Sequence, residues 1–355
     1  MTSDTDGRAF DLTGQITNSQ GTKAWATYNK GPGFLEFDLR TLKIKTHIDG
    51  PSGAYAISVA TSDFNEGVVA TGGADGYVRL WNLADLALAK EYHVAPPGGT
   101  VTDVDLIKGG QRAVVGVMRR PKNMEDRYKE GIQVFIVDLS NGTQRKLVDT
   151  PSWPHPGVSV IGDLLLYSGF DRMKLASIES GQVVREFVLK KPMRKSFLAS
   201  NNKWLGVLDE DKILTVFEVD TAREVSSRLI EADDHGPMVI TSDGHYVHQV
   251  ARGGSLTTWN IQSGEMSKHD LTRIQQMHTN VDFITLAHDD QWLVTAGNHG
   301  DVGVFERATG KLIFYEQSSA AAFYVEKVWI GGDRLIFTTD TGVMIDGRLV
   351  TSAPE

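Results

Sequence analysis

The chain has 355 residues, of which 41% are hydrophobic, so it can bury a large core. Its 36 basic and 45 acidic residues give a net charge of −9, which argues against general binding to polyanions. The sequence contains no cysteine, and this excludes disulfides, thiolate–metal sites and cysteine nucleophiles.

The first ten residues, MTSDTDGRAF, lack the basic and then apolar run of a signal peptide. No stretch of the sequence approaches the roughly 20 apolar residues of a membrane span. We therefore expect a cytoplasmic protein without a membrane span.

A strand ending recurs along the chain, in which an apolar residue is followed by a polar one. Its clearest example is VRLWNL, which ends at Trp81-Asn82 and follows a hairpin signal at Asp75-Gly76. The recurring positions, in chain order, are Phe37, Trp81, Val137, Ile178, Phe217, Trp259, Phe305 and Ile345. Differences between these numbers give spacings of 39 to 46 residues, with one longer spacing of 56.

A polar turn followed by an apolar run precedes each of these positions, as in KAWATY, VVATGG and QWLVTAG. Each unit is therefore predicted to hold four short strands in about 42 residues, which is the length of a propeller blade. The runs alternate and are broken by glycine, which disfavours a helical repeat. The sequence thus predicts an all-β, closed β-propeller of about eight four-stranded blades, with seven as an alternative.

Residues 1–355 are predicted to form one propeller domain, and a ring of blades must be closed by its ends. We expect the segment 8–12, RAFDL, to complete the C-terminal blade as its outer strand. If Arg348-Leu349-Val350 fills that place instead, the N-terminal segment is a free tail.

Residues 71–83 resemble the WD-repeat (WD40-like) family of β-propellers, and the period and strand order extend the resemblance, in divergent form, over nearly the whole chain. In that family a buried His–Ser/Thr–Asp–Trp network, called the staple below, holds each blade together. The resemblance implies incomplete staples, formed by Thr71, Asp75 and Trp81, by His235 and Trp259, and by His278 and Thr295. The repeat also resembles pyrroloquinoline-quinone propellers, but their tryptophan docking pattern is absent from most units.

Groups that would carry catalysis or bind a metal are scattered. His245 and His248 are three apart, which on a strand puts them on opposite faces. The other candidate histidines lie in turns of different units, and no spacing matches a zinc site. The sequence has no G-x-S-x-G elbow, phosphate loop or dinucleotide fingerprint. We predict no catalytic residue, no metal and no cofactor.

The third unit owes its extra length to residues 118–131, MRRPKNMEDRYKEG, predicted to connect its second and third strands. This segment carries five basic and three acidic residues, hence 5 − 3 = +2. Long loops in compact domains are usually functional or disordered. Further basic residues are predicted on the same rim, and together they would steer an acidic or phosphorylated segment. The basic candidates for partner binding are Arg119, Arg120, Lys122, Arg127, Arg172, Lys191, Arg194 and Lys195.

Aromatic residues complete the predicted binding surface. Trp153 and His155 lie in TPSWPHPG, a proline-stiffened connection between units, and Tyr55 begins an inner strand. Binding hot spots favour tryptophan, tyrosine and arginine. Solvated loops and core packing explain the same residues equally simply.

The sequence thus favours a protein–protein interaction scaffold that binds a protein or peptide on its loop face. The alternative is a propeller enzyme or small-ligand binder with a site at the central channel. Five polar residues are predicted near it but form no recognised set: Thr102, Asp103, His235, Thr279 and Asp282. Nucleic-acid binding is disfavoured, because the basic sector lacks interleaved aromatic residues.

Overall fold

A computed structural model describes residues 12–17, 23–28, 33–38, 43–48, 56–61, 67–119, 131–150, 158–168, 172–230, 236–251, 254–271, 281–287, 289–297, 301–317, 325–331, 334–339 and 344–348. These residues form strands and turns, and none of them belongs to a helix. In particular, they include no helix long and apolar enough to cross a bilayer. The chain divides into two compact units, Met1–Glu186 and Phe187–Glu355.

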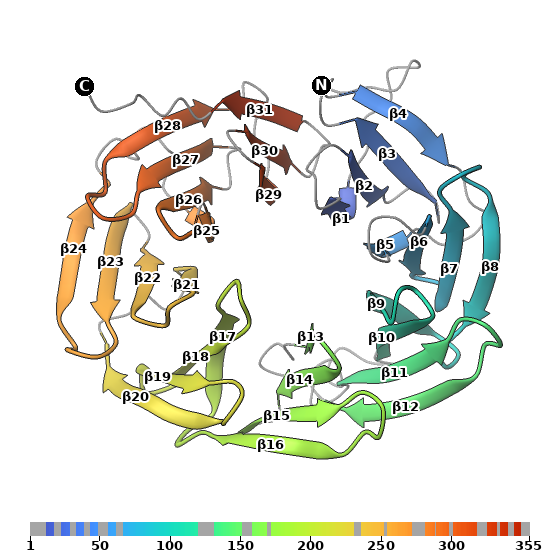
Figure 1. The fold of residues 1–355 in the computed structure, drawn as a ribbon, viewed down its shortest axis with the longest axis horizontal. Helices are drawn as coiled ribbons and strands as arrows, with labels where there is room; N and C mark the ends of the chain where they lie inside the picture. Colours follow the sequence, from blue (N-terminus) through green and yellow to red (C-terminus); the bar gives the residue numbers. More distant parts are fainter. Residues whose placement is uncertain are drawn as a thin grey trace. The chain divides into compact units, whose positions relative to one another are not determined.

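Unit 1 holds four antiparallel sheets of four strands each, and in each sheet the strands lie side by side in chain order (Figure 1). The first two sheets are β1 (Leu12–Thr17), β2 (Lys23–Tyr28), β3 (Phe34–Asp38) and β4 (Lys43–Ile48), then β5 (Ala56–Thr61), β6 (Val68–Gly73), β7 (Tyr77–Asn82) and β8 (Leu88–His93). The next two are β9 (Gly99–Ile107), β10 (Arg112–Arg119), β11 (Ile132–Asp138) and β12 (Gln144–Asp149), then β13 (Val158–Ile161), β14 (Leu164–Ser168), β15 (Arg172–Ser177) and β16 (Val183–Val188), whose last two residues fall in unit 2.

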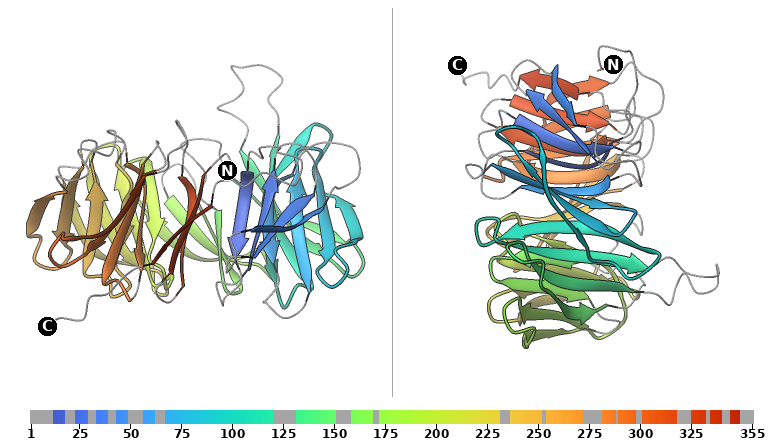
Figure 2. Two further views of the ribbon diagram at one scale, coloured as in Figure 1. Left: turned by 90° about the horizontal axis from the view of Figure 1, so that it is seen from above. Right: turned by 90° about the vertical axis from the view of Figure 1, so that its right-hand side faces the viewer.

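Unit 2 holds three four-stranded sheets and one sheet with three described strands. The four-stranded sheets are β17 (Met193–Leu198), β18 (Trp204–Asp209), β19 (Ile213–Glu218) and β20 (Arg223–Leu229), then β21 (Met238–Ile240), β22 (Tyr246–Val250), β23 (Ser255–Asn260) and β24 (Met266–Asp270), then β25 (Val281–Ala287), β26 (Trp292–Gly297), β27 (Asp301–Glu306) and β28 (Leu312–Gln317). The three-stranded sheet is β29 (Val325–Gly331), β30 (Arg334–Thr339) and β31 (Met344–Arg348). Each sheet is twisted, as the edge-on views show (Figure 2).

The predicted strand endings agree with the observed third strands in six units. In those units the marked residue is the last but one of its strand, as Trp81 is in β7. The other two positions, Ile178 and Ile345, were placed wrongly. Ladder register puts Ala176 and Gly347 at the equivalent position. Both residues are small, so the pattern of a large apolar residue at the strand ending does not mark them.

Within unit 1 the described core lies between consecutive sheets, and the sheet β5–β8 shows this by burying both of its faces. Residues of β6 and β7 that point one way, such as Ala70 and Leu80, pack against β9–β11. Those that point the other way, Val69 and Trp81, pack against Trp25 and Phe34 of the first sheet. Period-two alternation thus supplies two apolar faces per strand.

Two local features shape the described sheets, a glycine turn in the second sheet and a bulge before the outer strand in several. The Asp75-Gly76 turn needs glycine, since Gly76 has φ +84° and a Cβ there would lie 2.8 Å from that of Ala95. In addition, the ladder between the third and fourth strands shifts register in five sheets, as between Leu80 and Trp81. Such a bulge twists the outer strand and protects its exposed edge.

Candidate functional site

Most of the predicted partner-binding residues lie outside the described residues. This holds for Tyr55, Arg120, Lys122, Arg127, Trp153 and His155. Arg119 is the last residue of β10, and its side chain is not described. The segments that hold these residues, apart from Tyr55, follow β10 and β12 in the sequence. These two strands run in the same direction, so both finish at the same end of the sheet.

The described basic candidates are matched by nearby carboxylates. Arg172 and Lys174 of β15 approach Glu186 of the neighbouring strand at 3.1 and 3.6 Å. In unit 2, Lys191 lies 3.6 Å from Asp211. Most of this positive charge is therefore compensated locally, and both partners of each pair are partly exposed, so each pair adds little stability.

The remaining two basic candidates lie on β17. Arg194 is exposed, and the ammonium group of Lys195 donates a hydrogen bond of 2.8 Å to the carbonyl of Gly236. Lys195 therefore ties one sheet to the next instead of extending toward solvent.

In the second sheet the predicted staple separates into two pairs. The indole N–H of Trp81 donates to Thr71 Oγ1 at 3.0 Å, and both side chains are buried. Asp75 instead binds Arg79 through two hydrogen bonds of 2.6 and 3.2 Å. The guanidinium of Arg79 is buried and also lies over the ring of Tyr77, 5.1 Å from its centroid. A buried charge of this kind needs such a bidentate partner.

The seventh sheet keeps the threonine of the staple and lacks its donor. Thr295 is fully buried, and its hydroxyl has no hydrogen-bond partner among the described residues. Phe305 stands at the position of Trp81, ten residues later, and offers no N–H. A Cβ on Gly303 would lie 2.8 Å from the ring of Phe305 and 3.2 Å from Thr295 Oγ1, which places the two side chains together.

In the sixth sheet Trp259 is buried between its own sheet and the preceding one. The predicted staple residues His235 and His278 lie outside the described residues.

Sequence reasoning missed a contact that recurs between neighbouring sheets. A long side chain on the outer strand of one sheet donates to carbonyls just after the third strand of the next. Lys90 donates to Leu139 and Ser140 at 3.1 and 3.2 Å, and Arg145 donates to Ile178 and Glu179 at 3.0 and 2.6 Å. We call these contacts clasps. Ladder register puts both pairs of carbonyls at the same position in their sheets.

A third clasp joins the fifth and sixth sheets. Arg228 of β20 donates to the carbonyl of Gln262 at 3.1 Å. In the first clasp, the hydroxyl of Tyr92 also donates a hydrogen bond to the carbonyl of Leu139, at 2.5 Å. Cations on an outer strand look like solvated charges in a sequence, and only the register reveals their common target.

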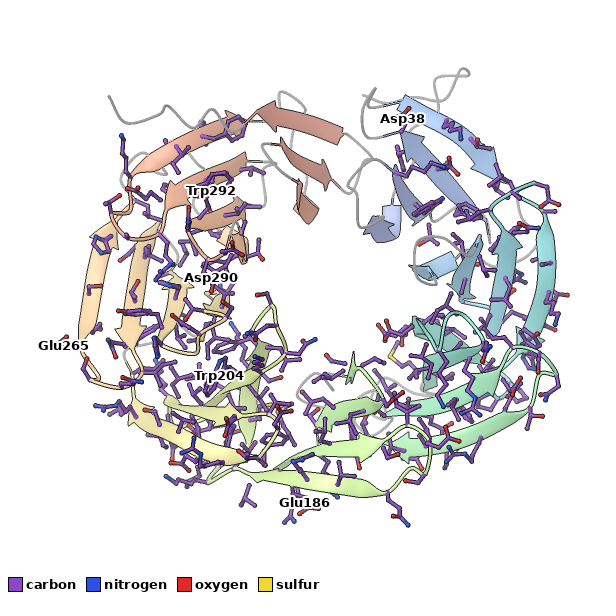
Figure 3. The ribbon with its side chains drawn as sticks, viewed as in Figure 1. Asp38, Glu186, Trp204, Glu265, Asp290 and Trp292 are labelled. Atoms are coloured by element: carbon purple, nitrogen blue, oxygen red, sulfur yellow. The ribbon has the colours of Figure 1, made fainter. Side chains whose placement is uncertain are left out.

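The turns between first and second strands form a second series of contacts in unit 2. The indole N–H of Trp204 donates to the carbonyl of Ser242 at 3.1 Å. The carboxylate of Asp290 accepts from both the backbone N–H and the hydroxyl of Ser242, at 2.5 and 2.6 Å. Arg307 then donates to the carbonyl of Asp290 at 2.6 Å. Three consecutive sheets are thus linked, from Trp204 to Asp290 (Figure 3).

The described histidines do not converge on a metal. Among the described residues, no group of three or more His, Asp or Glu side chains is placed to hold one. His248 lies buried in β22, its Nδ1 is 2.9 Å from Thr258 Oγ1, and its Nε2 has no partner among described residues. Burial, followed by the charge of Arg307, lowers the pKa of His248 to about 3. The ring is therefore neutral at physiological pH.

Asp103 of the inner strand β9 is the one described carboxyl whose pKa is raised. Burial raises the pKa of Asp103, while a hydrogen bond from the Thr102 hydroxyl (2.9 Å) lowers it. Asp103 is nevertheless an exposed residue. Protein lies close to its carboxylate, since a Cβ on Gly116 would lie 3.2 Å from Asp103 Oδ2.

The fold places this chain among known structures. The computationally designed Ika8 protein shares 13% identity with it, with 96% of each chain covered and a TM-score of 0.66. The C-terminal WD40 domain of Sif2 shares 15% identity over 98% of this chain and 97% of that chain, with a TM-score of 0.67. The β-propeller domain of Cps50 (Swd1) from Myceliophteria thermophila shares 14% identity over 97% and 98%, with a TM-score of 0.57.

The chain has a WD40-like β-propeller fold. The identities are too low to carry more than the fold, and as many as 1757 solved chains match it, so the likeness indicates no particular activity. Neither a family model nor a curated protein sequence matches the chain.

Proposed function

We propose that this WD40-like chain is a protein-interaction scaffold in the cytoplasm, whose partner binds on the face formed by the connections after β10 and β12. The observation that supports it most is that β10 and β12, which precede the two connections, finish at the same end of their sheet. The proposal is that the basic segment 118–131 and the Trp153–His155 segment share the surface at that end. An aromatic anchor beside basic side chains suits an acidic or phosphorylated peptide.

Charge on this surface has to come mainly from Arg119, Arg120, Lys122 and Arg127. Lys195 is held by a carbonyl, and Arg172 and Lys191 are opposed by carboxylates. Binding is therefore expected to weaken steeply as salt rises.

The test is recovery of partner proteins by affinity purification of the tagged full chain. We expect loss of the same partner when residues 120–130 are replaced by two glycines and when Trp153→Ala is introduced. Arg223→Met, which alters an exposed cation on an outer strand, serves as the control. Unchanged recovery with both variants would rule out this face.

A small-ligand site on the inner strands is the second candidate, and Asp103 favours it. A crowded carboxyl with a raised pKa that still reaches solvent is a feature of many functional sites. A ligand that protects wild type against thermal unfolding, but not Asp103→Asn, would support this reading over the scaffold.

A further inference from the structure

A hollow lies beside the outer strand β20, between the sheets β17–β20 and β21–β24 of unit 2. The centre of a water molecule can reach about 40 Å³ of it, which is room for about three water-sized groups. That space matches the branched end of a valine or leucine side chain. Its walls include Leu214, Ser226, Arg228, Leu229, Trp259 and Ile261.

Arg228 gives the hollow an unpaired cation. Its guanidinium is exposed and makes one hydrogen bond, to the carbonyl of Gln262 at 3.1 Å, and no carboxylate among the described residues pairs with it. Gly264, with φ +76°, packs directly under the guanidinium, where a Cβ would overlap it. Most donors of this fork therefore remain available to a carboxylate, which arginine binds through two bonds.

The backbone of β20 offers hydrogen bonds next to the hollow. The N–H of Ile230 donates to Lys212, so Ile230, Arg228 and Ser226 direct their backbone groups toward β19. Ser227 and Leu229, which alternate with them, direct theirs away from the sheet. The bulge at Val225 ends this regular stretch, and the stretch is therefore suited to a short segment. Leu229 is 72% exposed, an unusual position for a leucine on an edge strand.

The equivalent hollow of unit 1 lacks these features. It lies between β8 and the turn after β11 and is larger, about 560 Å³. Its two cations are already engaged, Lys90 by two carbonyls and Arg112 by Glu179 at 2.7 Å. It therefore serves as an internal control.

We propose that the edge of β20 and the adjoining hollow bind a short extended segment of a partner protein that carries Val, Ile or Leu two residues away from Asp or Glu. The segment adds a strand to β20 through Ser227 and Leu229. Residues two apart on a strand share a face. The aliphatic side chain thus enters the hollow while the carboxylate reaches Arg228. This site does not depend on the loop face proposed above.

A selection from a random dodecapeptide library on the immobilised full chain tests the proposal. We expect enrichment of the aliphatic–x–acidic pattern. The winning peptide, labelled with fluorescein, should bind Arg228→Met at least about tenfold more weakly than wild type, since a charged hydrogen-bonded pair is lost. Leu229→Pro should also abolish binding, because proline removes an outward N–H without removing a ladder bond. Leu229→Thr keeps that N–H, and Lys90→Met alters the control hollow. Both should bind as wild type.

Several results would overturn the proposal. The first is that no peptide is enriched. The second is that the enriched peptides bind Arg228→Met and Leu229→Pro as tightly as wild type. The third is that Lys90→Met weakens peptide binding as much as Arg228→Met does. A wild-type dimer that Leu229→Pro converts to monomer would identify a second copy of the chain as the occupant instead. Replacement of residues 120–130 should not change peptide binding at β20. The proposal for β20 and the proposal for the loop face can therefore be refuted independently.

Discussion

Two buried threonines, Thr71 and Thr295, occupy the same position in different sheets and differ in the hydrogen bonding of their hydroxyl groups. Thr71 accepts a hydrogen bond from the indole of Trp81, whereas Thr295 faces Phe305 and has no described partner. An unsatisfied buried polar atom costs stability, and replacing it by an apolar group of similar shape can be neutral or favourable.

Thr71→Val is therefore expected to lower the free energy of unfolding by about 1–3 kcal/mol, because the indole N–H of Trp81 stays buried without an acceptor. Thr295→Val should leave it within about 0.5 kcal/mol of wild type or raise it. Urea unfolding of the two variants provides the comparison. Equal losses would show that hydroxyl hydrogen bonding does not distinguish the two sheets.

His248 makes stability depend on acid. The pKa of His248 in the folded chain is about 3, below the ordinary 6.5. Between these pH values the unfolded chain binds a proton on this ring and the folded chain does not. The contribution of His248 is complete above pH 6.5 and falls as pH drops toward 3, by about 1.4 kcal/mol per unit. His248→Gln should flatten the unfolding free energy over this range relative to wild type. Parallel pH profiles would contradict the assignment.

At the scale of the elements, clasps link neighbouring sheets through side chains of their outer strands. Arg145 binds two carbonyls of the next sheet. We expect Arg145→Met to lower the unfolding free energy by about 1.5–3 kcal/mol, the range for hydrogen bonds to a charged group. Arg223→Met removes only an exposed pair and should cost less than about 1 kcal/mol. Similar values for both variants in chemical denaturation would show that the clasp is only a surface contact.

The elements also show what a sequence can predict. Period-two alternation and a large residue such as Trp81 or Phe217 located six third strands, because burial on both faces leaves a strong pattern. Ala176 and Gly347 escaped, since small residues at the same position carry no such signal. The Asp75–Arg79 pair and the clasps could not be predicted from the sequence, because they depend on strand register and on the neighbouring sheet. Arg228, which has no carboxylate partner among the described residues, looks in the sequence like any solvated cation.

For the whole molecule, closure depends on the last sheet, for which β29, β30 and β31 are described. Arg348 is the last residue of β31 and pairs with Arg334 of β30, so it belongs to the third strand. Leu12 pairs with Tyr28 in β1, so it belongs to the first sheet. Residues 8–11 come directly before that sheet in the sequence. We predict that they supply the outer strand of the last blade.

The absence of native cysteine allows a direct test of this closure. Ala9, Phe10 and Asp11 are replaced by cysteine one at a time, each together with Ile345→Cys. If residues 8–11 lie beside β31, at least one pair comes within the Cα separation of about 4.4–6.8 Å that a disulfide requires, and it should oxidise in the folded chain. That bond should raise the free energy of unfolding by about 2–4 kcal/mol. Val350→Cys with Ile345→Cys is the matched pair for the opposite arrangement. Crosslinking of that pair alone would assign the outer strand to the C-terminus and leave the N-terminal segment outside the ring.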